Sequence, residues 1–337
     1  MTEATTTSLS RRRWLARSAA AGVAAAPGLL PALARAAGPA WPSQALRIVV
    51  PFAAGGTSDV ISRLISKPLS DLLGQPVVVE NKTGASGNVG AGAVANATDG
   101  HTMLLSDLGA LAVSPLVSKD MPFKPEQLKG VTMLAYSPHL LVVHPSVPAS
   151  NVKELAALSQ KQRLNAASSG SGTPNHLGIV DIALGTGMKW QHVPYRGGAA
   201  AINDTVAGNT QMLLNGMVAT YPLVQAGKLK IIGVSKRTRM AVIGNVPTLA
   251  EQGVPNFESG TYQGVVVPST MSAPHVDKLN AALIQVIRES SIRARLVELG
   301  AEVMTSSPQE TTQWLVKERA RWASVIQRAG KELEGTA

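Results

Sequence analysis

From residue 46 onward, short apolar runs alternate with segments in which apolar residues recur every three or four positions. The run LRIVVPF is typical of a strand, and residues 57–73 have a helical periodicity that ends at a glycine. The run PVVVEN, a glycine-rich stretch and the run HTMLLSD repeat the order of strand, connection and strand. Strands separated by helical crossovers predict an α/β fold with mostly parallel sheets flanked by helices.

A second series of alternating elements begins after an apolar run at 140–148, which ends at prolines. A similar run at 262–270 is also apolar and also contains a proline near its end. Two such strands around the middle of the chain are typical of one α/β domain inserted into another. We therefore predict domain 1 at residues 41–142 plus 264–337 and domain 2 at residues 143–263. The two crossover strands would form a hinge, and the cleft between the domains would be able to close.

Residues 1–40 have a different composition, with a basic start, a weakly apolar alanine-rich middle and small residues near Ala36 and Ala37. This order predicts a secretory signal peptide that is cleaved near those alanines, and hence a periplasmic protein. The segment SRRRWL at Ser10–Leu15 resembles the twin-arginine export motif. The weak apolarity of the middle favours that route over the Sec route, which stays an alternative.

Charge and composition narrow the classes of partner. The 337 residues carry a formal net charge of +10, and removal of residues 1–40 would take away five arginines and one glutamate, leaving +6. A modest positive charge suits small anions, and no cluster of basic and aromatic residues predicts binding to nucleic acid. The chain has no cysteine, which excludes disulfides, thiolate metal sites and a cysteine nucleophile. We predict neither a metal nor a cofactor.

Three loops share one kind of chemistry: PFAAGGTSD, ASSGSGTPN and YRGGAAA. Each places glycine at or just before a predicted helix start, where the first N–H groups have no partner within the helix and attract an anion. A single loop of this kind would be explained as a tight turn. Three loops from both predicted domains, all after the carboxyl ends of strands, favour a binding site.

Sequence motifs for two other functions fail in detail. The segment GAGAVA at 90–95 matches a nucleotide-binding fingerprint, but the preceding strand ends well before Gly90. In SSGSG, Ser168 occupies the place of the first glycine of a hydrolase nucleophile elbow. The six histidines form no metal-binding spacing, and no pair of carboxylates stands out as acid and base. The chain is therefore predicted not to be an enzyme.

Together, these loops and several later segments resemble the Bug-type, or TctC-like, periplasmic solute receptors of tripartite tricarboxylate transporters. The resemblance rests on RIVVPFAAGGTSDVISRLISKPLSDLLGQPVVVENKTGASGNVG, ASSGSGTPNHL, HVPYRGGAAAINDTVAGNTQM, VPTLAEQGVPNFE and GVVVPSTMSAPHVDKLN. It implies a two-domain Venus flytrap of the type II kind, which binds a small organic carboxylate largely through backbone N–H groups, small hydroxyls and ordered water. It also implies delivery of this ligand to the membrane permease subunits of a transporter by a monomeric receptor.

The resemblance assigns the ligand-binding residues to the three loops and to two strand ends. They are Phe52, Ala54, Gly55, Gly56, Thr57, Ser106, Ser168, Gly170, Gly172, Thr173, Tyr195, Arg196, Gly197 and Asn215. Asp59 matches an aspartate of the family and is expected to cap the helix. Ala54 replaces a usual proline, which loosens the first loop. Asn215 stands where many members have an aspartate that can pair with an amino group, so it favours a carboxylate without an amine.

Two alternatives stay open from the sequence. One is an exported α/β enzyme that acts on small carboxylic acids, because catalytic residues can assemble from distant positions. The other is a ligand receptor for a sensor kinase, which would use the same binding event for signalling.

Overall fold

The computed structural model of the protein describes residue 2, residues 41–118 and residues 120–330, so the predicted signal peptide lies outside the described residues. The α-helices are α2 (Thr57–Leu73), α3 (Asn88–Ala95), α4 (Leu108–Val117), α5 (Val152–Ser159), α6 (Pro174–Thr186), α7 (Gly198–Val206), α8 (Met217–Gln225), α9 (Ala273–Arg288), α10 (Ser290–Glu298) and α11 (Pro308–Ala329). The strands are β1 (Leu46–Val50), β2 (Val77–Asn81), β3 (Thr102–Asp107), β4 (Leu128–Val143), β5 (Asn165–Ser168), β6 (Gln191–Pro194), β7 (Met212–Gly216), β8 (Lys230–Val234), β9 (Gly260–Pro268) and β10 (Glu302–Val303).

The strands form two parallel groups that are joined by two antiparallel strands. Their order is β2-β1-β3-β9-β4-β7-β5-β6, while β8 and β10 also pair with β4. Strand β1 is parallel to β2 and β3, and β5 is parallel to β6 and β7. Strands β4 and β9 run antiparallel to their neighbours. The predicted α/β fold with mostly parallel strands and flanking helices is confirmed.

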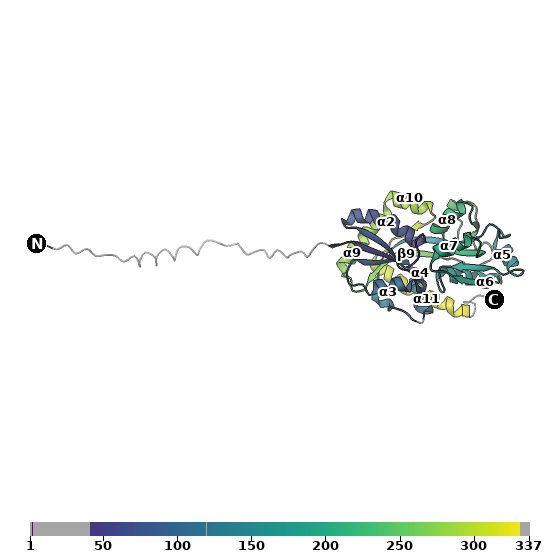
Figure 1. The fold of residues 1–337 in the computed structure, drawn as a ribbon, viewed down its shortest axis with the longest axis horizontal. Coiled ribbons are helices and arrows are strands. Elements are labelled where there is room, and N and C mark those ends of the chain that lie inside the picture. The colour runs from purple at the N-terminus through teal and green to yellow at the C-terminus, as the bar shows by residue number, and fades with distance from the viewer. Residues whose placement is uncertain (1, 3–40, 119, 331–337) are drawn as a thin grey trace. The chain divides into compact units, whose positions relative to one another are not determined.

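Strand β4 changes its partner halfway along its length. Residues 128–138 pair with β9, whereas residues 139–143 pair with β7. We use this change to name two parts: lobe 1 comprises the described residues of 41–138 and 260–330, and lobe 2 comprises residues 139–259. In Figure 1, α9 of lobe 1 and the helices α5 and α6 of lobe 2 lie at opposite ends of the folded body. The domain limits expected from the sequence stay predictions.

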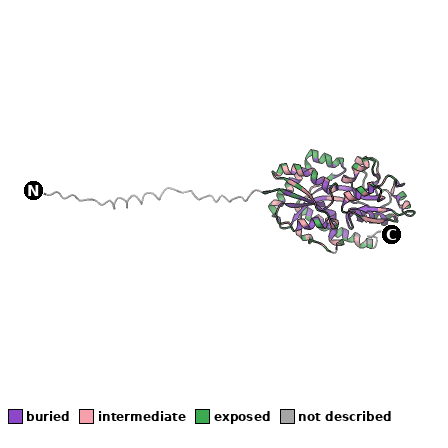
Figure 2. Ribbon diagram, in the orientation of Figure 1, coloured by how far each residue is buried: buried purple, intermediate pink, exposed green. Residues whose placement is uncertain are grey.

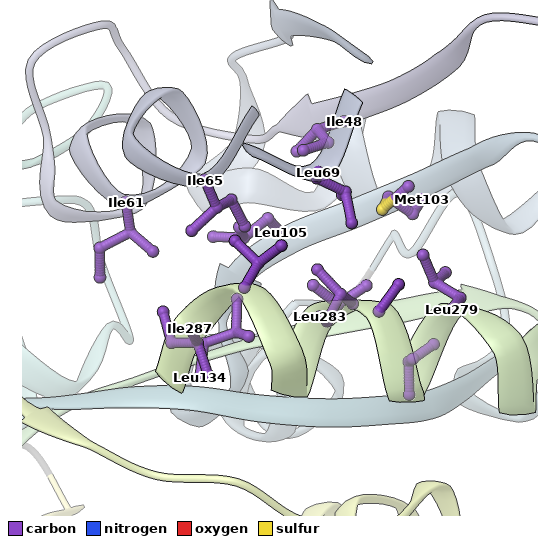
Figure 3. Close-up of a cluster of buried hydrophobic side chains, with 14 of the residues drawn as sticks. Ile48, Ile61, Ile65, Leu69, Met103, Leu105, Leu134, Leu279, Leu283 and Ile287 are labelled. Atoms are coloured by element: carbon purple, nitrogen blue, oxygen red, sulfur yellow. The ribbon is translucent and has the colours of Figure 1, made fainter. Parts of the chain in front are cut away.

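Each lobe has its own apolar core. In lobe 1, α2 places Ile61, Ile65 and Leu69 on one face, four residues apart, and all three are fully buried. Figure 3 shows these side chains packed with α9 over the strands. The core of lobe 2 is built around residues such as Trp190 and Ile179. Figure 2 shows buried residues along the strands and exposed residues on the outer faces of the helices.

A small cluster also joins the two lobes directly. Trp322 of α11 and Val113 of α4, both in lobe 1, pack with Leu177 of α6 in lobe 2. Trp322 is only 6% exposed, so this contact removes most of a large side chain from water. Within the part of the chain that the structure describes, no helix has the length and apolarity needed to cross a membrane.

Candidate functional site

The three glycine loops predicted from the sequence meet between the lobes. A Cβ atom at Gly197 in the third loop would lie 3.1 Å from the backbone nitrogen of Ala53 in the first. The second loop approaches lobe 1 through a hydrogen bond of 3.2 Å, which Ser86 Oγ donates to the carbonyl of Ser171. The loops therefore form opposing walls of one cleft, and the lobes touch across it.

Helix N-termini surround this cleft. Helices α2, α6 and α7 begin at the three loops, with Gly56, Thr173 and Gly197 as their N-cap residues. None of these three N-cap residues makes a side-chain capping hydrogen bond. The free N–H groups and the helix dipoles together favour negative charge in the cleft. At α6 the effect is smaller, because Pro174 has no N–H group to offer.

Between the walls lies a cavity of about 40 Å³. It is lined by Phe52, Gly56, Thr57, Ser58, Asp107, Ala110, Ser169, Thr173, Asn175, Gly198 and Asn215. Pockets that hold small organic ligands usually measure about 300–1,000 Å³, whereas a water molecule occupies about 30 Å³. The lobes are thus closed on each other, and an organic ligand would require them to move apart before it could enter.

The residues assigned from the family resemblance take four kinds of position. Those that line the cavity are Phe52, Gly56, Thr57, Thr173 and Asn215, while Ser106 lines an adjoining space of about 10 Å³ together with Phe52. Those on the surface are Ala54, Gly55 and Arg196. Those that are buried in the loops but do not line the cavity are Ser168, Gly170, Gly172 and Gly197. Tyr195 is partly buried, and its hydroxyl donates a hydrogen bond to the carboxylate of Asp204.

Two of the buried glycines allow the lobes to approach each other closely. Gly170 and Gly172 have φ angles of +132° and +75°, in the region that favours glycine. A Cβ atom at Gly172 would lie 2.5 Å from a methyl group of Val117, and one at Gly170 would lie 2.6 Å from Ser86 Oγ. A side chain at either position would hold the second loop away from lobe 1.

Asp59 shapes the first loop and does not line the cavity. Its carboxylate accepts hydrogen bonds from the Gly55 N–H group at 2.9 Å, Arg63 Nε at 2.9 Å and Asn81 Nδ2 at 3.0 Å. Burial by itself raises the pKa of Asp59, but these three hydrogen bonds outweigh burial and hold the pKa below its usual value. Its backbone donor, the Gly55 N–H group, precedes the N-cap Gly56, and α2 has no side-chain capping hydrogen bond, so Asp59 braces the first loop and does not cap the helix as expected.

Asp107 is a lining residue that was not assigned from the sequence. It ends β3 and caps α4, where its Oδ1 accepts hydrogen bonds from the N–H groups of Gly109 and Tyr262, both at 3.0 Å. Burial raises its pKa to about 7, although these two backbone donors act in the opposite direction. The sequence does place Asp107 at the end of a predicted strand. It does not predict the helix that follows, so the position of Asp107 at a helix start was not expected.

Two asparagines give the lobe 2 wall a neutral polar surface. Asn175 Nδ2 donates hydrogen bonds to Ser169 Oγ at 2.6 Å and to Asn215 Oδ1 at 3.3 Å. Asn215 Nδ2 donates in turn to Thr220 Oγ1 at 3.0 Å. The side chain of Asn215 is therefore held in one orientation, with no negative charge on this wall to repel an anion.

Behind the second loop, a serine and a histidine form a pair of the kind that catalytic sites use. Ser168 Oγ lies 2.6 Å from His192 Nε2 and accepts a hydrogen bond from the Gly170 N–H group. Burial lowers the pKa of His192 to about 4, and its ring stacks on that of His176. Ser168 is fully buried and lines neither of the two cleft spaces, so this pair braces the loop. Within residues 41–118 and 120–330, no three His, Asp or Glu side chains gather as a metal site would require.

Comparison with known proteins gives consistent matches. A family model described as "Tripartite tricarboxylate transporter family receptor" matches residues 61–331. A UPF0065 protein from the tcbD-tcbE intergenic region of Pseudomonas sp. strain P51 is 33% identical, with 85% of this chain and 87% of that protein covered. Protein BugT of Bordetella pertussis is 30% identical, with coverages of 87% and 92%.

Comparison with solved structures also finds proteins that are similar over most of the chain. Rpa4515 of R. palustris with adipate superposes with a TM-score of 0.83 at 32% identity, covering 86% of this chain and 98% of that one. MatC from Rhodopseudomonas palustris with bound malate gives a TM-score of 0.79 at 31% identity, covering 85% and 100%. Both of these similar proteins carry a dicarboxylate. The fold described above is thus shared with these two proteins over nearly the whole described chain.

Proposed function

We propose that this chain, which belongs to the TctC family of tripartite tricarboxylate transporter receptors, captures a small organic carboxylate in the cleft between its lobes. The observation that carries the proposal is the convergence of helix N-termini without side-chain caps on one closed cleft. Such donors recognise a carboxylate without a cationic side chain. The dicarboxylates in two similar structures support this class of ligand.

The ligand is proposed to be held on both sides of the cleft. Its carboxylates would accept hydrogen bonds from the first turns of α2 and α7, while Thr57, Thr173 and Asn215 supply side-chain contacts. Asn215 is neutral, which favours a ligand without an amino group. The exposed position of Arg196 leaves it a minor role as a source of positive charge near the cleft.

Membership of the family supports a proposal for the biological role. We propose that the mature protein works in the periplasm as a monomer and delivers its ligand to the permease subunits of a tripartite transporter. Closure around the ligand would provide the signal that the permease recognises, with β4 and β9 as the hinge. The same closure would serve a sensor kinase, which stays the alternative partner. The buried position of Ser168 argues against the alternative of an exported enzyme.

A thermal-shift screen of mono-, di- and tricarboxylates, including adipate and malate, tests this proposal. A ligand at 100 times its Kd adds about 2.7 kcal/mol of stability, which corresponds to a rise in Tm of roughly 5–10 °C for a domain of 150–250 residues. We expect one or a few carboxylates to give such a rise, and amino acids to give none. Recovery of a chemically altered ligand after incubation would contradict the proposal and favour the enzyme.

A further inference from the structure

A second cavity, of about 710 Å³, shares no lining residue with the cleft. One wall is formed by Lys236 and residues 239–242, which follow β8 in lobe 2. The other is formed by residues from the end of α9, from α10 and from β10 and its flanks in lobe 1. Strands β8 and β10 both pair with β4, at residues 140–143 and 135–136 respectively. The cavity therefore spans the place where β4 passes from one lobe to the other. We call it the hinge cavity.

The hinge cavity is strongly basic. Its lining includes Lys236 and Arg239 from lobe 2, Arg288 and Arg293 from lobe 1, and only one carboxylate, that of Glu302. Lys236 pairs with Glu302, which links the lobes. Arg239 pairs at 3.0 Å with a carboxylate outside the lining. Like charges that share one cavity repel each other, and an anion bound among them would relieve that repulsion.

The two arginines of lobe 1 are the cations without an acidic partner. Among the described residues, neither Arg288 nor Arg293 has a carboxylate within ion-pair distance. Arg288 Nη2 donates a hydrogen bond to Thr305 Oγ1 at 2.7 Å, which fixes one side of its guanidinium group. Arginine forks bind planar acidic groups well, because two parallel N–H groups match two oxygens.

Apolar side chains complete the lining. Met240 and Val242 come from lobe 2, and Val297 and Val303 come from lobe 1. Val297 is 52% exposed, so its side chain is accessible to a molecule in the cavity. A cavity with a volume in the usual range for small ligands, and with both apolar and cationic walls, suits an organic anion better than a fully hydrated inorganic ion.

We propose that the hinge cavity binds a small organic polyanion, with two or more acidic groups on a carbon framework, and that Arg288 and Arg293 make its main contacts. Cations from both lobes would then hold one molecule at the hinge. The proposal is independent of the function proposed for the cleft, because the two sites share no residue.

Isothermal titration with benzene-1,3,5-tricarboxylate tests the hinge cavity. The cleft is first blocked by Gly56→Asp, so that only binding outside the cleft is measured. The test variant carries Arg288→Gln and Arg293→Gln in that background. The matched control carries Arg295→Gln and Lys317→Gln, which remove the same net charge from α10 and α11 at positions outside the lining. We expect one molecule to bind per chain, the test variant to bind about tenfold more weakly or worse, and the control to change less than twofold.

Each other outcome would overturn the proposal. Equal weakening in the test and control variants would show a general effect of net charge. An absence of binding by the Gly56→Asp protein at millimolar concentration would mean that the cavity is no site for such anions. A glutamate-rich peptide that binds far more tightly than the tricarboxylate, and depends on the same two arginines, would show that the cavity docks an acidic protein segment instead.

Discussion

Gly56 is the position at which recognition of the ligand by helix N-termini can be tested most cleanly. It is the N-cap of α2, with φ of −77° and ψ of 168°, a conformation that any residue adopts. A Cβ atom there would lie 3.4 Å from the Ala53 carbonyl and 3.9 Å from the Ala199 nitrogen, which are ordinary contacts. Gly172 is a poor alternative, because its positive φ and its contact with Val117 would confound charge with strain.

The substitution Gly56→Asp should remove ligand binding without loss of stability. An aspartate at an N-cap accepts hydrogen bonds from the second and third N–H groups of the helix, here those of Ser58 and Asp59. This is expected to stabilise the helix by a few tenths of a kcal/mol relative to glycine. The ligand would lose two charge-assisted hydrogen bonds of about 1.5–3 kcal/mol each. The sum of about 3–6 kcal/mol corresponds to roughly 140-fold to 20,000-fold weaker binding.

The assay is isothermal titration with the carboxylate that gives the largest thermal shift, together with a melting curve for each variant. Gly56→Asn is the matched control, because it caps the helix in the same way without the charge; it should lose less affinity than Gly56→Asp. Ser272 is the N-cap of α9 and does not line the cleft. The variant Ser272→Asp therefore adds the same charge at another helix start and should bind the ligand normally. Arg196→Ala should weaken binding less than Gly56→Asp does.

The reasoning would be refuted if Gly56→Asp bound the ligand within threefold of the parent protein while Arg196→Ala abolished binding. That pair of results would mean that a side-chain ion pair holds the carboxylate, and that Arg196 moves into the cleft when the ligand binds.

Four further predictions concern the cleft, its closure and export. Burial raises the pKa of Asp107 to about 7, so its carboxyl group ionises between pH 6 and pH 8 and would then repel a bound anion. Ligand affinity, measured by titration at each pH, should therefore fall several-fold to about tenfold over that range, and Asp107→Asn should flatten this pH profile. Trp322→Ala removes an apolar contact with Leu177 across the lobes and should weaken binding about tenfold by making closure less favourable; unchanged affinity would show that this contact does not favour the closed form. X-ray scattering should give a smaller radius of gyration with saturating ligand than without it, and an unchanged radius despite binding would contradict a hinge at β4 and β9. Replacement of Arg11 and Arg12 by lysine should leave uncleaved precursor in the cytoplasm, as followed by immunoblotting, whereas normal maturation would favour the Sec route.

Local patterns in the sequence were sufficient to predict the elements that carry the glycine loops. The helix at residues 57–73 has the limits that were expected, because its apolar face repeats every three or four residues and Gly74 ends it with a φ of +70°. The loops could be predicted because a strand, a glycine and a helix start follow each other within a few residues. That the three loops would meet in one cleft was predicted only from the general rule that ligands of open α/β sheets bind beyond the carboxyl ends of the strands.

The parts that were missed depend on long-range contacts. Strand β4 runs over 16 residues, but only its last residues were expected. The first part of β4 contains Thr132 and Ser137, which are polar, and Pro138, a residue type that usually breaks strands. These residues are buried because β4 lies at the centre of both lobes. Polar groups find hydrogen-bond partners there, and Ser137 Oγ, for example, accepts a hydrogen bond from the Val218 N–H group. Helix α4 was missed because Asp107 leads from strand to helix without a glycine turn.

The cleft and the hinge cavity handle charge in opposite ways, and this difference bears on how a receptor of this kind releases its ligand. In the cleft, backbone N–H groups carry only partial charges, and the one acidic side chain in the lining, that of Asp107, weakens the attraction for an anion above about pH 7. Under the proposed mechanism, recognition there would depend on geometry, and because the donors come from helices of both lobes, their convergence would end when the lobes separate. In the hinge cavity, full charges on long side chains attract anions over a greater distance and in more than one geometry. A ligand held by fixed donors from both lobes would therefore be released when the cleft opens, whereas a polyanion at the hinge would remain bound through much of that motion.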